Sequence, residues 1–168
     1  MKFPENTLQY ISESLRCVKE TISVAESVSA GLLQFAFSQM PCASEFFKGG
    51  MTTYGLPEKT KFLTVDRVEA ENNDCVTQNI ANTMALNVAQ LFEIDWSIGI
   101  IGYATAVKES GDKIYCYFSI AYKNQIVVAK SIELHPKTVA KDAQQFYVEF
   151  ILGCLKTEIS HLMLCQKV

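Results

Sequence analysis

Histidine, proline and glycine are scarce in this sequence, whose 168 residues include 2 His, 4 Pro and 8 Gly. So few glycines and prolines exclude a collagen-like chain and a flexible linker. About 49% of the residues are apolar and 20% are charged, which is typical of a globular protein rather than a disordered one. The length predicts one domain over residues 1–168, with a core large enough to fold without a metal ion or a disulfide.

Concentrated positive charge is also missing. The 15 basic residues are scattered without a run of three, and 18 acidic residues bring the net charge to −3. Binding to nucleic acid needs a basic surface that neutralises phosphates, so we expect no nucleic-acid partner. The longest uncharged stretches, residues 27–44 and 76–92, contain several Ser, Asn and Gln residues, so we expect no membrane span. Residues 1–5 lack the apolar core of a signal peptide, which predicts a cytoplasmic protein.

Closely spaced metal ligands are absent. No two of the 6 cysteines lie within ten residues of each other, and His135 and His161 have no neighbour at ligand spacing. The sequence therefore lacks the C-x-x-C pattern of metal and redox sites. We expect reduced cysteines that mostly pack as small buried side chains, and no metal site.

Hydrophobic periodicity predicts alternating helices and strands. Strands are expected at residues 21–25, 49–54, 97–102, 114–122 and 126–134. Helices are expected after residue 7, at 32–40, from Pro57, at 76–92 and from Pro136, whereas residues 65–74 are polar and ambiguous. Strands separated by helices pair in parallel, and the short connection at 123–125 indicates an antiparallel hairpin. The prediction is an α/β fold, a three-layer α/β/α sandwich on a mixed, mainly parallel sheet with a late antiparallel hairpin.

One helix has an unusual polar face. Residues 76–92 place Asn and Gln, rather than Lys and Glu, opposite the apolar positions. This composition indicates a face that is partly covered, and a partner chain could provide the cover.

Ligands of open α/β sheets bind beyond the carboxyl ends of the strands, which directs attention to the loops at 26–31, 41–59 and 102–113. The first loop places Ser27, Ser29 and Gly31 just before a helix, where free N–H groups favour an anion. It loosely resembles a nucleophile elbow without the leading glycine. The alternative is that one of the two serines simply caps the helix.

The second loop contains Ser44, Tyr54 and Lys59. A serine hydroxyl needs a base to become a good nucleophile, and no histidine is suitably placed for a Ser-His-Asp triad. A lysine can act as the base when burial or a nearby cation lowers its pKa, and a tyrosine hydroxyl can relay the proton. These residues could converge into a catalytic group. The alternative is that they are a helix cap, the edge of the core and solvent-exposed surface.

Two motifs carry a resemblance to a known family. Residues 25–31 read A-E-S-V-S-A-G and resemble A-E-S-C-T-G-G. Residues 42–59 read C-A-S-E-F-F-K-G-G-M-T-T-Y-G-L-P-E-K and resemble G-S-S-x-x-F-x-G-G-x-x-x-Y-x-x-x-x-K. A helix motif, V-S/T followed by M-A, recurs at Val76-Thr77 and Met84-Ala85. On these motifs nearly the whole sequence resembles the carboxy-terminal domain of CinA-type competence/damage-inducible proteins.

The resemblance implies a function, because stand-alone members of that family are nicotinamide mononucleotide amidohydrolases. It implies that Ser44, Tyr54 and Lys59 form the catalytic group. It also implies a nucleotide-like small-molecule substrate, no metal or organic cofactor, and a homodimer. The residues expected near the substrate are Ser27, Ser29, Gly31, Gly102 and Thr105.

The sequence departs from the family pattern around the substrate. Val28 and Ala30 replace Cys and Gly in the first motif, and residues 102–111 have lost the Pro and most glycines of a G-I-A-G-P-x-G-G stretch. Tyr103 adds bulk to that loop, and residues 137–141 contain no Arg where the family has Gly-Asp-Arg. A lysine does not replace a phosphate-clamping arginine like for like. We therefore expect a retained nucleophile with an altered substrate cradle.

Two functions follow from these observations. In the first, the protein is an amidohydrolase in which Lys59 accepts the Ser44 proton, Tyr54 assists, and Ser44 attacks a carboxamide carbon to release ammonia. In the second, it is a catalytically silent or retuned homologue that binds a nucleotide or a protein partner.

Overall fold

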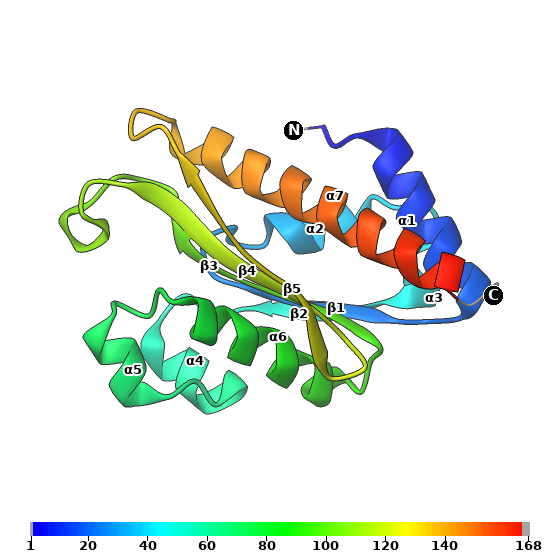
Figure 1. Cartoon of the computed structure of the whole chain (residues 1–168), viewed down its shortest axis with the longest axis horizontal. Coiled ribbons are helices and arrows are strands. Elements are labelled where there is room, and N and C mark those ends of the chain that lie inside the picture. Colours follow the sequence, from blue (N-terminus) through cyan, green and yellow to red (C-terminus); the bar gives the residue numbers. More distant parts are fainter. Residues whose placement is uncertain (1, 166–168) are drawn as a thin grey trace.

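The computed structural model of the chain, which describes residues 2–165, contains one five-stranded sheet in the order β2-β1-β3-β4-β5 (Figure 1). The strands are β1 (Ile22–Glu26), β2 (Phe47–Thr52), β3 (Trp96–Tyr103), β4 (Ile114–Tyr122) and β5 (Gln125–Leu134). β1 pairs in parallel with β2 and β3, whereas β4 pairs antiparallel with both β3 and β5. Only β4 opposes the other strands, which confirms the mixed, mainly parallel sheet and the late hairpin.

Helices cover both faces of the sheet and complete the predicted three layers (Figure 1). One face carries α1 (Glu5–Val18), α2 (Leu32–Ser38), α3 (Ala43–Phe46) and α7 (Ala140–Cys165). The other carries α4 (Leu56–Leu63), α5 (Arg67–Asn72) and α6 (Gln78–Phe92), and a short 3₁₀ helix, η1, spans Lys108–Ser110. Residues 1 and 166–168 of the predicted single domain lie outside the described part of the chain.

The central strands are apolar because both of their faces are covered. Every residue of β1 is buried, as are the first six of β3. Alternate residues point to two separate clusters, so that Val24 packs beneath α2 and α7 while Ala25 packs against α6. Gly99 allows this close packing, since a Cβ there would overlap the Ala81 carbonyl oxygen and the Ala85 nitrogen on α6.

The chain itself partly covers the polar face of α6. The Gln78 amide donates to the Ser119 hydroxyl of β4 over 2.8 Å, and that hydroxyl donates to Asn82 over 2.6 Å. Asn87 donates to the Leu63 carbonyl oxygen over 2.6 Å. The side chains of Gln78, Asn82 and Asn87 therefore join α6 to its own sheet and to α4, which accounts for part of the polar composition of this face.

Several sequence expectations need correction. β2 begins and ends two residues earlier than predicted, and α7 starts at Ala140 because a turn follows Pro136. The expectation of mostly buried cysteines is wrong, since Cys116 alone is buried among the five whose side chains are described, and Cys165 lies outside that set. No helix within residues 2–165 is both long and apolar enough to cross a membrane.

Candidate functional site

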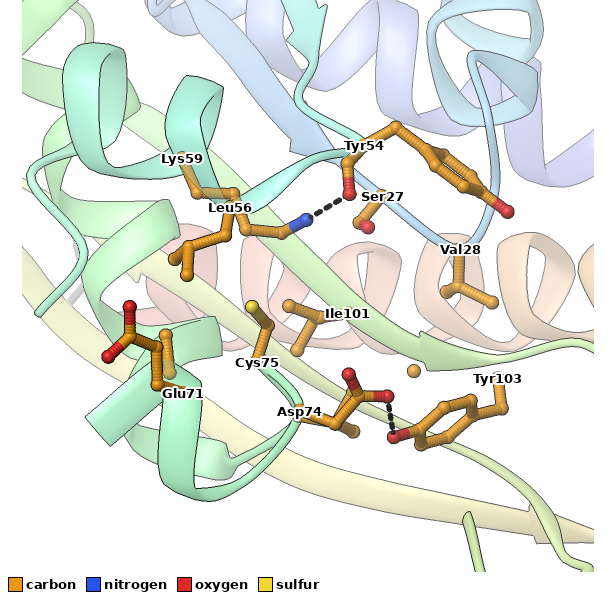
Figure 2. Close-up of a pocket in the computed structure, with 13 residues that line it drawn as sticks. Ser27, Val28, Tyr54, Leu56, Lys59, Glu71, Asp74, Cys75, Ile101 and Tyr103 are labelled. Carbon is orange, nitrogen blue, oxygen red and sulfur yellow. Dashed lines mark hydrogen bonds between the residues drawn. The ribbon is translucent and has the colours of Figure 1, made fainter. Parts of the chain in front are cut away.

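A cavity of about 360 Å³ opens at the carboxyl ends of β1, β2 and β3 (Figure 2). This is the edge of the sheet where α/β proteins bind ligands. The cavity lies between the strand ends on one side and α4, α5 and the α5–α6 loop on the other. Its lining residues are Ser27, Val28, Tyr54, Leu56, Lys59, Ala70, Glu71, Asp74, Cys75, Val76, Ile101, Gly102 and Tyr103.

Ser27 reaches the cavity from a tight turn between β1 and α2. Its backbone nitrogen donates to the Ile100 carbonyl oxygen of β3 over 3.1 Å, and its side chain is only 7% exposed. Ala30 has a φ of 51° and Gly31 a φ of 95°, so the chain reverses through two left-handed residues before the helix. A strand, a strained turn and a helix are the setting of a nucleophile elbow, although the sequence lacks its usual leading glycine.

The Glu26 side chain caps the amino terminus of α2. Its buried side chain accepts hydrogen bonds from the Ser29 hydroxyl over 2.6 Å and from the backbone nitrogens of Gly31, Leu33 and Gln34 over 2.8–3.1 Å. An acidic group at a helix amino terminus satisfies unpaired N–H groups and complements the helix dipole. The anion that the sequence predicted at this turn is therefore the protein's own carboxylate. Ser29 and Gly31 bind that carboxylate and do not line the cavity.

Lys59 points into the cavity from the first turns of α4. Pro57 lies at the start of this helix, a position that proline favours. The Lys59 side chain is 2% exposed, and its Nζ donates to the Tyr54 carbonyl oxygen over 2.7 Å. Figure 2 shows the amine turned toward that carbonyl, and Ser27 lines the same cavity. Ser27, which follows β1, and Lys59, which lies on α4, therefore line one cavity.

Burial lowers the pKa of Lys59 below its ordinary value near 10.5. The desolvation of the charged amine outweighs the opposing influence of Cys75, Glu58 and Asp74. A lysine with a lowered pKa is more often neutral, and only a neutral amine can accept a proton from a serine.

The backbone of the β2–α4 connection holds Tyr54 next to Ser27. The Thr53 nitrogen donates to the Glu26 carbonyl oxygen over 2.9 Å, which extends the pairing of β1 and β2 beyond the strand ends. The Tyr54 side chain is 76% exposed, and its hydroxyl points away from Lys59 (Figure 2). Tyr54 therefore steadies Lys59 through its carbonyl oxygen, and the predicted relay through the hydroxyl is not formed in this structure.

Ser44 lies at the opposite edge of the sheet. It belongs to α3, which precedes β2, whereas Tyr54 follows that strand. Six strand residues at about 3.3 Å each separate the two positions by roughly 20 Å. Glu45 pairs with Arg16 of α1 over 2.7 Å, which fixes this helix near the amino end of the sheet, and Ser44 is exposed. The expected convergence of Ser44 with Tyr54 and Lys59 is wrong within one chain, because a whole strand intervenes.

The loop after β3 closes one side of the cavity. Gly102 lines it, while Thr105 is exposed and lies outside. A Cβ at Gly102 would come within 2.7 Å of the Cys116 side chain on β4, so this glycine serves strand packing. Tyr103 donates its hydroxyl to Asp74 Oδ2 over 2.6 Å and bridges to the α5–α6 loop. Burial and this hydrogen bond to Asp74 raise the pKa of Tyr103, which keeps the donor protonated.

One wall of the cavity, formed by Glu71, Asp74 and Cys75, was not predicted from the sequence. Asp74 and Cys75 have φ angles of 49° and 62°, an uncommon left-handed pair without glycine. Residues 72–74, Asn-Asn-Asp, are turn formers directly before a helix, and this signal could have identified the turn. Burial raises the pKa of the Cys75 thiol, although Lys59 opposes that effect.

Comparison with known proteins gives consistent results. The family profile described as CinA C-terminal domain matches residues 5–157. A CinA-like protein of Picosynechococcus sp. is 36% identical over 144 residues, which are 86% of this chain and 34% of that protein. A CinA-like protein of Rippkaea orientalis is 34% identical over 100 residues, which are 60% of this chain and 24% of that protein. The chain thus spans about a quarter to a third of the length of these curated relatives.

Solved structures share the fold. The crystal structure of a competence or damage-inducible protein from Enterobacter asburiae has a TM-score of 0.86 at 19% identity, covering 95% of this chain and 99% of that one. A CinA superfamily protein from Escherichia coli has a TM-score of 0.78 at 24% identity, covering 91% of this chain and 89% of that one. At this identity the likeness concerns the fold alone. The profile match over residues 5–157, together with the relative that is 36% identical, shows that the chain belongs to the CinA C-terminal domain family.

Proposed function

We propose that the protein is an amide hydrolase in which Ser27 is the nucleophile and Lys59 is the general base. The observation that carries this proposal is the placement of Ser27 in the same cavity as a buried lysine. The family resemblance supplies the reaction class, because stand-alone CinA-type members are nicotinamide mononucleotide amidohydrolases. Ser27 takes the role that the family resemblance implied for Ser44.

The mechanism needs no group beyond these side chains and water. Neutral Lys59 accepts the Ser27 proton as Oγ attacks the carboxamide carbon. The protonated amine then gives that proton to the leaving nitrogen, and ammonia departs. Lys59 then accepts a proton from water as the water attacks the acyl-enzyme, and it gives that proton to Ser27 Oγ as the carboxylic acid leaves, which restores the free serine and the neutral amine. The backbone N–H of Val28, which directly follows the nucleophile, would stabilise the oxyanion, as in a nucleophile elbow.

Ammonia release from nicotinamide mononucleotide and from its dephosphorylated nucleoside tests the reaction. Ser27→Ala should reduce the rate to background, and Ser44→Ala serves as a matched control that should stay within about twofold of the parent protein. Release that survives in Ser27→Ala, or disappears in Ser44→Ala, would overturn the assignment.

A second test does not depend on the substrate. A fluorophosphonate that traps activated serines should form one adduct, located on Ser27 by peptide mass spectrometry. The adduct should be absent from Lys59→Met and retained in Ser44→Ala. An adduct confined to Ser44 would contradict the proposal.

The second candidate function is a retuned homologue that binds a small ligand without hydrolysing it. The Tyr103–Asp74 hydrogen bond, which occupies the side where the family has a glycine-rich loop, favours this alternative. Binding of an intact amide by the parent protein, with no ammonia release and no serine adduct, would support it.

The resemblance also implies a homodimer. We propose this assembly as part of the function, and sedimentation equilibrium of the purified protein measures it directly. A monomer at all concentrations would contradict it.

A further inference from the structure

Tyr103 and Asp74 connect two walls of the cavity. Tyr103 is the last residue of β3, and Asp74 lies in the loop between α5 and α6. The hydrogen bond of 2.6 Å between the Tyr103 hydroxyl and Asp74 Oδ2 therefore joins a strand end to this loop (Figure 2). Tyr103 is partly exposed and Asp74 is exposed, so solvent lies directly beyond the link. The link forms the boundary of the cavity on this side.

The Tyr103 ring is held in place by β4 and α7. It packs against the Tyr115 ring with the centroids 5.4 Å apart, and the Tyr115 ring in turn packs against Tyr117 over 5.7 Å. Such edge-to-face contacts stabilise one orientation of an aromatic ring. The hydroxyl of Tyr147, a buried residue of α7, donates to the Tyr103 carbonyl oxygen over 3.1 Å. Tyr103 is thus a built part of the cavity wall in both its main chain and its ring.

The turn that carries Asp74 is anchored as well. Asp74 and Cys75 have φ angles of 49° and 62°, a region that aspartate tolerates better than most residues. The Cys75 nitrogen donates to the Ala70 carbonyl oxygen over 2.8 Å, which ties the turn to the end of α5. Left-handed residues persist only where their surroundings hold them. Asp74 therefore has a fixed place opposite Tyr103.

This closed side limits the size of a ligand. The cavity of about 360 Å³ is at the small end of the range for ligand sites. A ligand that extends past Tyr103 must move the ring away from Tyr115 and break the hydrogen bond to the Asp74 carboxylate, which costs free energy. A compact ligand that stays inside the boundary requires neither change. The wall therefore favours compact ligands over extended ones.

We propose that Tyr103 is a specificity-determining residue, held in position by Asp74, and that it restricts the site to compact carboxamides. This inference rests on the proposed amide hydrolysis and concerns which amides reach Ser27 and Lys59. The bulk that Tyr103 adds to the altered loop then selects substrates by size.

Stepwise shortening of residue 103 tests the inference. Nicotinamide and nicotinamide mononucleotide carry the same carboxamide, and only the larger one bears a ribose phosphate. The ratio of kcat/KM for the mononucleotide to kcat/KM for nicotinamide should rise about threefold in Tyr103→Phe, which loses only the hydrogen bond. It should rise at least about tenfold in Tyr103→Ala, which also opens the wall. An unchanged or lower ratio in Tyr103→Ala would overturn the size limit while leaving Ser27-dependent hydrolysis intact.

Two control variants separate size from charge and from stability. Asp74→Asn keeps the length of the side chain and an oxygen that can accept the hydrogen bond, so the ratio should stay within about twofold of the parent value. Tyr122→Phe removes a tyrosine–carboxylate hydrogen bond of the same 2.6 Å length, to Glu20 at the opposite end of the sheet, and should leave the ratio unchanged. A rise in Asp74→Asn as large as that in Tyr103→Ala would assign the selection to charge and refute the proposal. Circular dichroism verifies that each variant is folded, and Tyr103→Leu takes the place of Tyr103→Ala if the alanine variant is not.

Failure of the proposed function has a different signature. If neither amide is hydrolysed in a Ser27-dependent manner, isothermal titration into Ser27→Ala, with and without Tyr103→Ala, still tests the size limit. The Kd of the mononucleotide should fall at least about tenfold when residue 103 is shortened, while the Kd of nicotinamide changes by less than about threefold. An unchanged Kd for the mononucleotide, or no binding of either amide to either variant, refutes the inference.

Discussion

The two ends of the parallel strands β1 and β2 present a lysine, a glutamate and a serine in very different settings. Near the amino end, Ser44 is exposed, Glu45 pairs with Arg16 at the surface, and Lys48 donates to a carbonyl oxygen in solvent. At the carboxyl end, Ser27, Glu26 and Lys59 are all buried. The same residue types are therefore surface groups at one edge of the sheet and include candidate catalytic residues at the other. Burial and strand direction, rather than residue type, separate the two.

The largest expected difference between the two edges concerns catalysis. Lys59→Met should reduce kcat for amide hydrolysis by about 10³-fold or more, because it removes the proposed general base. Lys48→Met, at the other end of the strand, should stay within about twofold. Steady-state ammonia release measures both. A loss of activity in Lys48→Met comparable to that in Lys59→Met would erase the distinction between the edges.

Stability should differ in the same direction. Glu26→Gln should lower the free energy of unfolding by about 2–3 kcal/mol, because a buried charged acceptor of four hydrogen bonds is lost. Glu45→Gln removes only a solvent-exposed ion pair with Arg16, so its unfolding curve should nearly overlay that of the parent. Urea unfolding followed by circular dichroism provides the comparison. Equal destabilisation by the two substitutions would contradict the assigned roles.

The buried lysine also predicts a pH dependence. Because burial holds the pKa of Lys59 below 10.5, the unfolded chain binds more protons than the folded chain between the two pKa values. The free energy of unfolding should therefore rise with pH through the window that ends near 10.5, and kcat/KM should rise as Lys59 becomes neutral. Urea unfolding at a series of pH values, with Lys59→Met as the control, measures how the free energy of unfolding changes with pH. A slope that persists unchanged in Lys59→Met would assign it to other groups.

The smallest effects should come from two tyrosines that donate to carboxylates at opposite edges. Tyr122 donates to Glu20 over 2.6 Å near the amino end, and Tyr103 donates to Asp74 over 2.6 Å near the cavity. Tyr122→Phe should lower the free energy of unfolding by about 1 kcal/mol without altering KM. Tyr103→Phe should change KM a few-fold with a smaller effect on unfolding. The reverse pattern would place the functional edge at the wrong end of the sheet.

The sequence predicted the sheet well because its signals are local. The apolar run in β3 and the alternating residues of β4 and β5 read directly as strands, and the short connection at 123–125 required a hairpin. The boundaries of β2 were less accurate because its three residues Lys48, Gly49 and Gly50 have little β preference.

The candidate site was only partly predictable. The loops around Ser27, Lys59 and Gly102 were correctly placed at the edge that forms the cavity. Ser44 was misplaced because residues 41–59 were treated as one loop, although β2 lies within them and separates its ends. The wall formed by Glu71, Asp74 and Cys75 was missed because residues 65–74 have no periodic pattern. Only the fold brings Asp74 within hydrogen-bond distance of Tyr103.

The Glu26 carboxylate has a consequence for how this chain can evolve. Its hydrogen bonds fix the main chain of the turn through Ser29, Gly31, Leu33 and Gln34, and none of them involves the side chain of residue 27. These hydrogen bonds therefore hold the turn without using the Ser27 side chain. Under the proposed mechanism, one mutation in the codon for Ser27 would remove the nucleophile and leave a folded protein with an intact cavity, so that catalysis could be lost without any change of architecture.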